Sequence, residues 1–321
     1  MGSAPTVSVI ICAYSDDRWE RLHEAVGSLQ RQTVPPLETV VVIDHNPRLL
    51  ERALEQLDGA KVVENSRAPG AGGSRNTGVD LARGEIIGFL DDDAAADPRW
   101  VDEIQRAHQS GNILGIGGTL EPVWDQGRPS WFPEEFQWVV GCDYRGLPDG
   151  VAEVRNVISA NMSVDRAAFV AAGGFRRDFG KIGTRSEPED TELCIRLSSL
   201  NPSRPWLYWP SARALHHVPR SRTRFGYFLS RCRDEGTGKA ALRGVMPGRE
   251  ALASERSYVL HVLPSGVLKN LRDCVVRREP AKLSRAAVII LGLGVTVLGF
   301  CEQLARLRIQ RVLGRAERKE R

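Results

Sequence analysis

Cysteine is sparse in this chain, and the cysteines it has do not form pairs. The six cysteines among 321 residues are scattered, with no CxxC sequence and no paired spacing. Disulfide-dependent secreted proteins carry many paired cysteines, so the sequence argues against a disulfide scaffold and favours a reducing cytoplasm. A charged N-terminal region followed by a long apolar core is also missing, so we expect no secretory signal peptide.

The motifs that most often hold nucleotide phosphates are missing as well. No GxxxxGK[ST] sequence occurs. Gly70 and Gly72 resemble the start of a dinucleotide-binding GxGxxG motif, but position 75 is Arg75 and the segment follows the third expected strand rather than the first. Internal repeats and low-complexity tracts are also absent. Any nucleotide must therefore be bound by residues outside these two motifs.

What remains is the composition of an ordinary globular protein. Hydrophobic residues make up 42% of the chain and charged residues 26%, with a formal net charge of +4. Acidic residues concentrate before about residue 190, and arginines crowd the C-terminal third. Charge alone leaves phosphates, anionic lipid and nucleic acid open as partners of that basic third. No aromatic residues are interleaved with its densest basic stretch, so we expect no nucleic-acid partner.

Strand-like and helix-like segments alternate through the first hundred residues. Near-continuous apolar strands separated by amphipathic helices favour a mostly parallel sheet covered on both faces. The sequence therefore predicts an α/β fold of the Rossmann-like, nucleotide-binding kind. The expected strands are 7–14, 38–44, 61–64 and 85–90, and the expected helices are 17–30, 47–57 and 74–83.

Three aspartates, Asp91, Asp92 and Asp93, directly follow the apolar run 85–90. A buried strand that ends in clustered carboxylates puts negative charge at the sheet edge where open α/β folds bind ligands. Two carboxylates one residue apart can share a hard divalent cation that keeps room for substrate phosphates. The alternative is a solvated turn before a helix that begins at Asp97-Pro98.

The pattern loosens after the aspartates. We expect strands at 115–120 and 155–164, a helix at 166–172, and a loop rich in tryptophan and proline at 124–138. An amphipathic helix at 187–197 carries acidic residues in its first turn, where the helix dipole alone would favour them. Residues 225–243 are expected to form a helix, a loop and a second helix.

An uncharged run of sixteen residues, 286–301, lies near the C-terminus. It falls just short of the ~20 residues of a spanning helix. Its glycines are tolerated in membrane helices, and basic residues follow it, so we expect association with an anionic membrane surface through one hydrophobic helix or a peripheral hairpin. A buried or dimer-forming helix is the alternative. The basic residues of the tail are Arg306, Arg308, Arg311, Arg315, Arg318, Lys319 and Arg321.

Together these motifs resemble the inverting family 2 glycosyltransferases of the GT-A fold. The resemblance covers residues 6–224 and rests on VSVIICAY, the aspartate that ends VVVID, an Arg-Asn-x-Gly helix, FLDDDA, a Gly-Gly-Phe turn and a Glu-Asp helix start. It implies transfer of a sugar from a nucleoside diphosphate sugar, UDP by default, to a hydroxyl of a glycan or lipid-linked acceptor. It also implies a divalent cation, Mg²⁺ or Mn²⁺, and a carboxylate base.

The resemblance also assigns roles to residues. Asp190 is the expected base and Glu189 positions the acceptor, although Pro188 replaces the usual glycine before this pair. Asp93 is the expected direct metal ligand, with Asp91 nearer the sugar or ribose. Asp44 is expected to contact the nucleobase or ribose; the alternative is that it only caps a turn. Arg75 and Asn76 are expected to lie beside the donor; the alternative is that they cap the N-terminus of a helix and that the arginine is solvated. The expected donor-site residues are Ala13, Tyr14, Asp44, Arg75, Asn76, Asp91, Asp92 and Asn161.

Two adjacent histidines, His216 and His217, follow the last expected core strand. In many members of the family a histidine here supplies a further metal ligand. Adjacent side chains on an extended segment point in opposite directions, so only one can reach the metal, and we favour His217. Arg220, Arg222 and Arg224 are expected to bind diphosphate, because guanidinium groups suit phosphate oxygens. The alternatives are a solvated basic loop and a contact with anionic lipid.

The expected organisation is a GT-A domain over 1–224, with a nucleotide-binding half (1–114) and an acceptor half (115–224), followed by a helical, membrane-associated extension over 225–321. We expect the protein to act at the inner face of the cell membrane, in the synthesis of cell-envelope polysaccharide. A sugar nucleotidyltransferase and a non-catalytic nucleotide-sugar-binding relative are the alternatives. The first usually has a glycine-rich basic loop after its first strand, where this chain has Ala13-Tyr14-Ser15-Asp16-Asp17.

Overall fold

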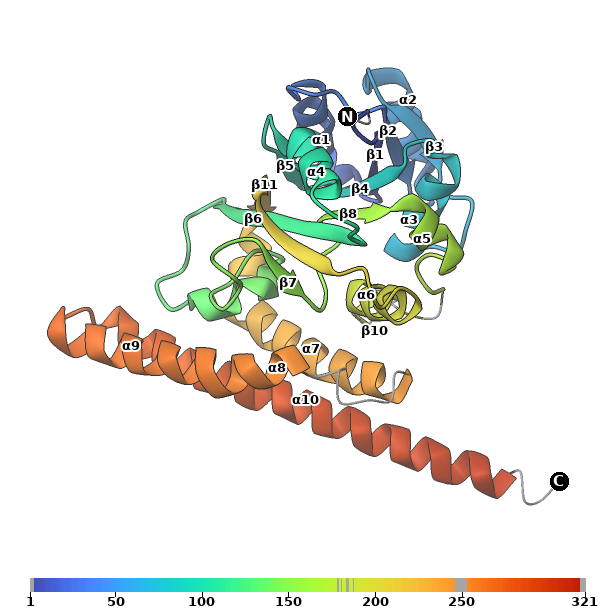
Figure 1. Ribbon diagram of the computed structural model, residues 1–321. Helices are drawn as coiled ribbons and strands as arrows, with labels where there is room; N and C mark the ends of the chain where they lie inside the picture. The colour runs from blue at the N-terminus through green and yellow to red at the C-terminus, as the bar shows by residue number, and fades with distance from the viewer. Residues whose placement is uncertain are drawn as a thin grey trace.

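The computed structural model describes residues 3–317 except for 178, 180, 183–184, 187 and 246–252. For residues 181–182, 185–186, 245, 253–254 and 310–317 it describes the backbone but not the side chains. Figure 1 shows a sheet with helices on both faces, formed by the larger N-terminal part of the chain. The long helices of the C-terminal part form a separate layer below it.

The first half of the sheet is parallel, as the alternating pattern predicts. Its strands lie in the order β3-β2-β1-β4, and every neighbouring pair runs in the same direction. The elements are β1 (Val7–Ala13), α1 (Trp19–Gln30), β2 (Glu38–Ile43), α2 (Pro47–Gln56), β3 (Lys61–Glu64), α3 (Ala71–Leu81) and β4 (Ile86–Asp91). A 3₁₀ turn, η1 (Asp16–Arg18), precedes α1.

Alternation along each strand divides the core into two layers, because successive strand residues point to opposite faces. Val9 and Ile11 of β1 pack with α1, α2 and α4 (Trp100–Gln109) on one face. Ile10 packs with α3, α5 (Arg166–Ala171) and α6 (Glu189–Leu200) on the other. Both faces are covered, which explains why these strands are apolar throughout.

The second half of the sheet is mixed in direction. β8 (Asn161–Asp165) is antiparallel to both β4 and β6 (Gly115–Trp124), β6 is parallel to β11 (Trp206–Val218), and β5 (Ala94–Ala96) and β7 (Ala152–Val154) pair antiparallel with β11. The strand expected over 155–164 is confirmed only for its end, because β8 begins at Asn161 and residues 155–160 are not strand. A 3₁₀ segment, η2 (Glu134–Val140), overlaps the end of the loop expected at 124–138, and β9 (Lys181–Ile182) pairs with β10 (Arg185–Ser186).

The C-terminal region packs as a helical layer around a third hydrophobic cluster. A short turn, η3 (Arg220–Thr223), leads into α7 (Phe225–Val245), which is continuous, so the expected break within 225–243 is wrong. Then follow α8 (Ala253–Ser257), the π-helical turn η5 (Tyr258–Val262), α9 (Leu263–Val276) and α10 (Ala281–Glu317). Phe132 and Phe136 of the aromatic segment pack against Phe228 of α7, with ring centroids 5.6 and 5.3 Å away, and join this layer to the sheet domain.

Two glycines let α7 and α10 approach closely. A Cβ atom on Gly236 would lie 2.0 Å from the carbonyl oxygen of Thr296, and one on Gly299 would lie 2.4 Å from that of Arg233. Small residues permit such backbone contact between helices in soluble and membrane proteins alike. Gly299 therefore has a packing role besides its compatibility with a membrane.

α10 is nevertheless long and apolar enough to cross a membrane. The most apolar 18-residue window within Ala281–Ile309 has a mean hydropathy of 2.0, and only 28% of that window is buried. Of the expected basic tail, the side chains of Arg306 and Arg308 are described. Those of Arg311, Arg315, Arg318, Lys319 and Arg321 lie outside the described residues.

The Gly-Gly-Phe turn packs closely against Asn76 at Gly174, and substitutions at its two glycines test this fit. The φ of Gly174 is +69°, and a Cβ there would lie 2.4 Å from Oδ1 of Asn76, whereas Gly173 has φ +82° with nothing within 4 Å. We expect Gly173→Ala to lower the free energy of unfolding by about 1 kcal/mol through backbone strain alone. Gly174→Ala should lower it by about 3 kcal/mol, because the clash adds to the strain. Denaturant unfolding measures both, and equal losses would contradict the tight fit.

Candidate active site

Three parallel strands end side by side at one edge of the sheet. In the register of β1, Ala13 is opposite Ile43 of β2, and Cys12 is opposite Asp91 of β4. The backbone N–H of Asp44 donates to the carbonyl of Ala13, at 2.8 Å. The strand-end aspartates that the sequence predicts to be functional therefore meet at the carboxyl edge, where such sheets bind ligands.

Asp44 organises the loop beside this edge. Its carboxylate accepts hydrogen bonds from Nδ2 of Asn65 (2.7 Å) and from the backbone N–H of Gly70 (2.8 Å), and it contacts the ring of His45. Burial alone would raise the pKa of Asp44, but these hydrogen bonds lower it. Asp44 thus carries a fixed negative charge at the mouth of the site and anchors the start of α3.

Arg75 connects the sheet edge to α6. Its guanidinium donates to Oδ1 of Asp91 at 3.2 Å and to Oε1 of Glu189 at 2.6 Å, and it lies over the ring of Phe175. The residue is only 7% exposed, so the alternative of a solvated arginine is wrong. Asn76, next to it, exchanges two hydrogen bonds with the backbone of Phe175, of 2.8 and 2.9 Å. Its side chain holds the Gly-Gly-Phe turn.

The aspartates that follow β4 have different environments. Asp92 is buried and pairs with Arg18 at 2.7 Å, and burial raises the pKa of Asp92 to about 7. Asp93 is buried as well, which would raise its pKa. Contact with His216 and the charges of Arg222 and Arg18 outweigh burial, so the pKa of Asp93 is lowered. Asp93 is therefore the buried member of the pair that stays ionised.

A divalent cation fits between Asp91, Asp93 and His216. One ligand atom from each residue lies within 4.8 Å of the others. Oδ1 of Asp93 is 3.2 Å from Nε2 of His216 but is a buried oxygen without a hydrogen-bond partner. Such an orphaned oxygen needs an explanation, and a bound ion supplies one. Two carboxylates and an imidazole are suitable ligands for Mn²⁺ and related cations.

The choice of His217 as the metal-facing histidine is wrong. His216 is buried beside Asp93, and its Nδ1 lies 3.6 Å from Sγ of Cys142. His217 instead bonds through Nε2 to the carboxylate of Asp125, and only its backbone N–H reaches Asp93, at the carbonyl oxygen. The two side chains do point in opposite directions, as an extended strand requires, but periodicity does not say which one faces inward.

Glu189 and Asp190 begin α6. Oδ1 of Asp190 accepts from the backbone N–H of Thr191 (2.9 Å), and Oδ2 accepts from that of Ser159 (3.3 Å). Burial raises the pKa of Asp190 in spite of these bonds, and burial likewise raises the pKa of Glu189 against the effect of Arg75. A carboxylate with a raised pKa is a stronger base, so Asp190 is chemically suited to take a proton.

Asn161 lies behind the site and has no free donor or acceptor for a ligand. Its Oδ1 accepts from the indole of Trp100 (2.7 Å), and its Nδ2 donates to the carbonyls of Thr119 and Ala212. It is buried where β4, β6, β8 and β11 meet. Any influence of Asn161 on a donor is therefore indirect, through the position of the strand ends.

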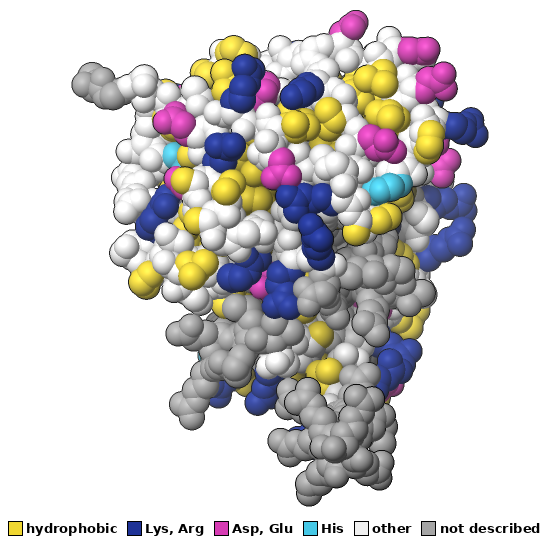
Figure 2. Space-filling view, turned by 90° about the vertical axis from the view of Figure 1, so that its right-hand side faces the viewer, with side chains coloured by type: hydrophobic (Ala, Val, Ile, Leu, Met, Phe, Trp, Pro, Cys, Tyr) yellow, Lys and Arg dark blue, Asp and Glu magenta, His cyan; other side chains and the backbone are white. Residues whose placement is uncertain are grey.

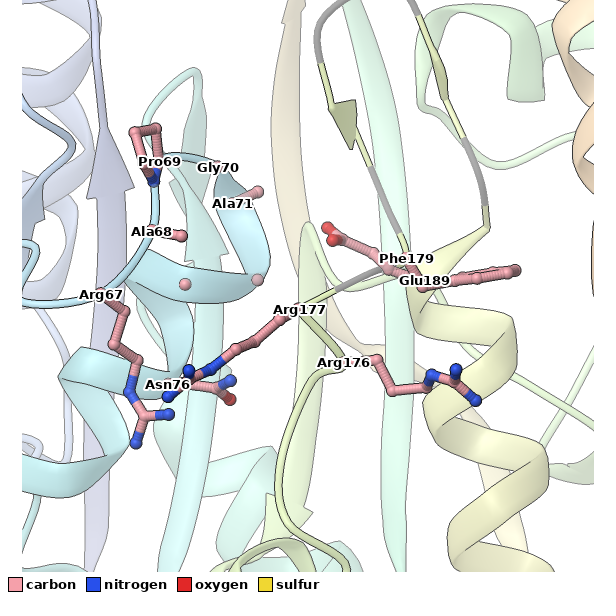
Figure 3. Close-up of a pocket in the computed structure, with 12 residues that line it drawn as sticks. Arg67, Ala68, Pro69, Gly70, Ala71, Asn76, Arg176, Arg177, Phe179 and Glu189 are labelled. Atoms are coloured by element: carbon pink, nitrogen blue, oxygen red, sulfur yellow. The ribbon is translucent and has the colours of Figure 1, made fainter.

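Two cavities meet at Glu189. The smaller, of about 30 Å³, lies between the start of α3 and the segment with Arg176 and Arg177, as Figure 3 shows. The larger, of about 560 Å³, lies between the start of α6 and the C-terminal helices, and Asp190 also lines it. The second cavity is large enough for a sizeable ligand next to the carboxylate pair.

Two arginines contact the acidic cluster, and sequence reasoning missed the role of one of them, Arg18. Arg18 bridges Asp92 and Asp93, at 2.7 and 3.3 Å, and lies over the ring of Tyr14. Arg222 lies 3.3 Å from Oδ2 of Asp93, so it contacts the acidic cluster directly. The only signal for Arg18 is its place just after the first strand, next to Asp16 and Asp17.

Comparisons with known proteins agree with this geometry. A family model described as "Glycosyl transferase family 2" matches residues 8–170. The glucosyl-dolichyl phosphate glucuronosyltransferase of Haloferax volcanii is 30% identical over 299 residues, which cover 92% of this chain and 94% of that protein.

Two solved structures share the fold at low sequence identity. The mannosyltransferase PcManGT of Pyrobaculum calidifontis, in complex with GDP-Man and Mn²⁺, has a TM-score of 0.58 at 16% identity and covers 94% of this chain and 88% of its own. GalNAc-T7 with UDP, GalNAc and Mn²⁺ has a TM-score of 0.53 at 15% identity and covers 80% of this chain and 54% of its own. The expected GT-A fold is thereby confirmed.

The two histidines provide a matched test of the metal site. We expect His216→Ala to weaken Mn²⁺ binding at least about tenfold, because it removes one of three ligands. His217→Ala should change the affinity less than about twofold, since its ring faces Asp125. Calorimetric titration with Mn²⁺ measures both variants. Equal affinities, or a larger loss in His217→Ala, would show that the cation is held elsewhere.

Proposed function

Because this chain belongs to glycosyl transferase family 2, we propose that it moves a sugar from a nucleoside diphosphate to a hydroxyl of a lipid-linked acceptor, with inversion at the anomeric carbon. One observation carries the proposal. A metal-competent acidic cluster at the sheet edge and a second carboxylate pair at the start of α6 are held side by side by Arg75. This reaction needs two separate acidic groups, one for the leaving diphosphate and one for the attacking hydroxyl.

The donor binds at the carboxyl edge of the sheet. The charge of Asp44 suits the hydroxyls of a ribose or the N–H groups of a base, and Tyr14 is half exposed at the end of β1. Arg75 and Asp91 lie where the donor sugar meets the diphosphate. UDP is our default nucleotide. The two structural neighbours were solved with UDP and with GDP-Man, so the fold accommodates either base.

Asp91, Asp93 and His216 would hold a divalent cation beside the diphosphate. Such an ion supplies Lewis-acid stabilisation of the negative charge that develops on the leaving diphosphate. Arg222 and Arg18 lie next to Asp93, so they add positive charge on the same side.

Asp190 accepts the proton of the acceptor hydroxyl as the hydroxyl oxygen attacks the anomeric carbon. The bond from that carbon to the diphosphate breaks, and the diphosphate leaves with the electron pair. Attack on the face opposite to the leaving group inverts the anomeric centre. Glu189 is held by Arg75 at 2.6 Å, so its carboxyl group is fixed next to Asp190, where it accepts a hydrogen bond from another acceptor hydroxyl.

A lipid-linked acceptor is supported by two findings. The relative that aligns over 92% of this chain is named for action on a glucosyl-dolichyl phosphate. In this chain the cavity beside Asp190 is also lined by apolar residues of α10. A purely glycan acceptor would gain little from such a wall, whereas the chain of a lipid would pack against it.

The C-terminal layer would lie on the inner face of the cell membrane. A wide apolar surface on α9 and α10 is left uncovered by the described residues, and the charged side chains that are coloured in the lower half of Figure 2 are mostly Lys and Arg. Amphipathic helices of this kind bind in the interfacial plane, helped by anionic lipid. The exposed apolar residues include Leu268, Val275, Val276, Leu283, Ile290, Leu291, Val297 and Leu298.

Asp190→Asn tests the catalytic assignment. We expect the rate of sugar transfer to fall about 10²–10⁴-fold, because the amide cannot take the proton. In the unmodified protein the raised pKa of Asp190 means that this side chain is protonated at a higher pH than an ordinary aspartate. The rate should therefore decrease as pH falls through that raised pKa, and this acid limb should vanish from the residual rate of Asp190→Asn.

The control for this variant is nucleotide binding. Calorimetric titration with UDP, GDP and dTDP, with and without Mn²⁺, should give the same preference in Asp190→Asn as in the unmodified protein, and binding should be lost in Asp93→Ala. Full activity in Asp190→Asn would refute the base assignment. Nucleotide binding without any sugar transfer by the unmodified protein would indicate a non-catalytic relative.

Membrane association is tested by charging the uncovered apolar surface. Val275 and Ile290 are 78% and 61% exposed, while Val151 and Val170, outside α9 and α10, are each 55% exposed. We expect Val275→Glu combined with Ile290→Glu to lower binding to anionic vesicles at least about tenfold, through lost apolar burial and added repulsion. Val151→Glu combined with Val170→Glu should bind as the unmodified protein does. Sedimentation with vesicles measures the binding of both double variants. An equal loss of binding in the two would show that the uncovered surface of α9 and α10 is not the membrane-binding surface.

A further inference from the structure

The lining of the large cavity beside Asp190 combines charged and apolar side chains. The charged residues include Asp190, Glu189 and the cations Arg155 and Lys239. The apolar residues include Leu293, Val297 and Phe300 of α10. A cavity of about 560 Å³ with both charged and apolar lining suits an amphipathic ligand better than a free sugar.

The two cations are built into an anion-binding arrangement. Arg155 follows β7, and Lys239 lies on α7; their side chains are only 16% and 13% exposed. Burial alone would lower the pKa of Lys239, but the charges of Glu235 and Glu255 outweigh burial and raise this pKa above its usual value, so the amine is charged. Two buried cations that reach one point from different elements form a preorganised site for an anion.

In this structure the anion between them is a carboxylate of the chain itself. Glu255, on α8, accepts two hydrogen bonds from Arg155, of 2.6 and 2.7 Å, and one contact from Lys239, of 2.8 Å. Burial alone would raise the pKa of Glu255, but the hydrogen bonds from Arg155 and the charge of Lys239 lower it to about 2. The fork of two parallel N–H donors that holds this carboxylate has the geometry that also binds phosphate oxygens.

We propose that Arg155 and Lys239 bind the phosphate of a lipid-linked acceptor, in competition with Glu255, while the lipid chain runs along α10. The inference rests on the proposed function, because it places the acceptor relative to Asp190. All these side chains line one cavity, so a sugar attached to the bound phosphate lies next to the base. Val297 is half exposed and adjoins the uncovered apolar surface, which gives the lipid chain a path out of the cavity.

Competition with Glu255 makes the site selective. A phosphate ester carries at least the single negative charge of a carboxylate and offers further acceptor oxygens to the two cations, so it can exchange for Glu255 at the cation pair. An uncharged lipid alcohol cannot displace the carboxylate. The arrangement therefore discriminates in favour of lipid phosphates and against free lipid or neutral glycan.

The full-length protein is titrated by calorimetry with farnesyl phosphate, with farnesol and with inorganic phosphate. We expect farnesyl phosphate to bind more tightly than farnesol and inorganic phosphate. Lys239→Met should weaken the binding of farnesyl phosphate at least about tenfold, because a charged hydrogen bond is lost, while the affinity for farnesol should change less than about twofold. Glu255→Gln should raise the affinity for farnesyl phosphate several-fold, because the competing charge is removed.

Controls separate binding from folding. Lys239→Arg keeps the charge and should retain farnesyl phosphate binding, and Lys61→Met, far from the cavity on β3, should behave as the unmodified protein. Equal loss of farnesyl phosphate and farnesol in Lys239→Met, or weaker farnesyl phosphate binding in Glu255→Gln, would show that Arg155, Lys239 and Glu255 are only a structural ion network.

Two further competition experiments identify the source of the phosphate. If inorganic phosphate binds the site as tightly as farnesyl phosphate does, the site binds free phosphate, and the proposal is overturned. Displacement of farnesyl phosphate by phosphatidylglycerol vesicles would make it a membrane headgroup site, and would overturn the proposal too. Sugar transfer without farnesyl phosphate binding would reject this site alone. Farnesyl phosphate binding without any sugar transfer would reject the proposed function and leave the phosphate site standing.

Discussion

The ion pairs of one buried arginine determine how the rest of the site is arranged. Arg75 pairs with both Asp91 and Glu189, and Glu189 lies 114 positions after Arg75 in the chain. The arginine therefore connects the parallel half of the sheet to α6. A buried guanidinium that lost either partner would leave an uncompensated charge, at a cost of about 3–5 kcal/mol. Gly72 lies close to this contact, because a Cβ there would lie 3.2 Å from both Oε2 of Glu189 and Cβ of Phe175.

The cations around the acidic cluster explain why two of its carboxylates behave so differently. Five acidic groups crowd the space between β4 and α6, and burial favours the neutral form of Asp92, Asp93, Glu189 and Asp190. Asp93 stays ionised because His216, Arg222 and Arg18 surround it, whereas Asp92, with Arg18 as its one near cation, has a pKa raised to about 7. Negative charge thus remains concentrated where Asp91 and Asp93 face each other, and a divalent cation would relieve it.

The sequence predicts those parts of the molecule that depend on local pattern. The strand at Lys61–Glu64 is confirmed to the residue, and the parallel strands and the acidic strand end follow from apolar runs and their polar ends. The choice between His216 and His217 depends on the rotation of β11 against β6, which period-2 alternation leaves open. The role of Arg18 and the bridge made by Arg75 depend on contacts between residues more than 70 positions apart, and no local signal encodes those.

The C-terminal helices show why a compositional signal needs a packing context. The glycines of 286–301 first suggest a membrane helix, yet Gly299 also brings α10 against α7 at a distance no other residue allows. That close approach places the apolar wall of α10 opposite the start of α6, with the large cavity between them. The hydrophobic helix therefore serves two surfaces at once. One side completes a cavity next to Asp190, and the other remains uncovered by the described residues, so under the proposed function the base would lie beside the boundary where a lipid-linked acceptor arrives.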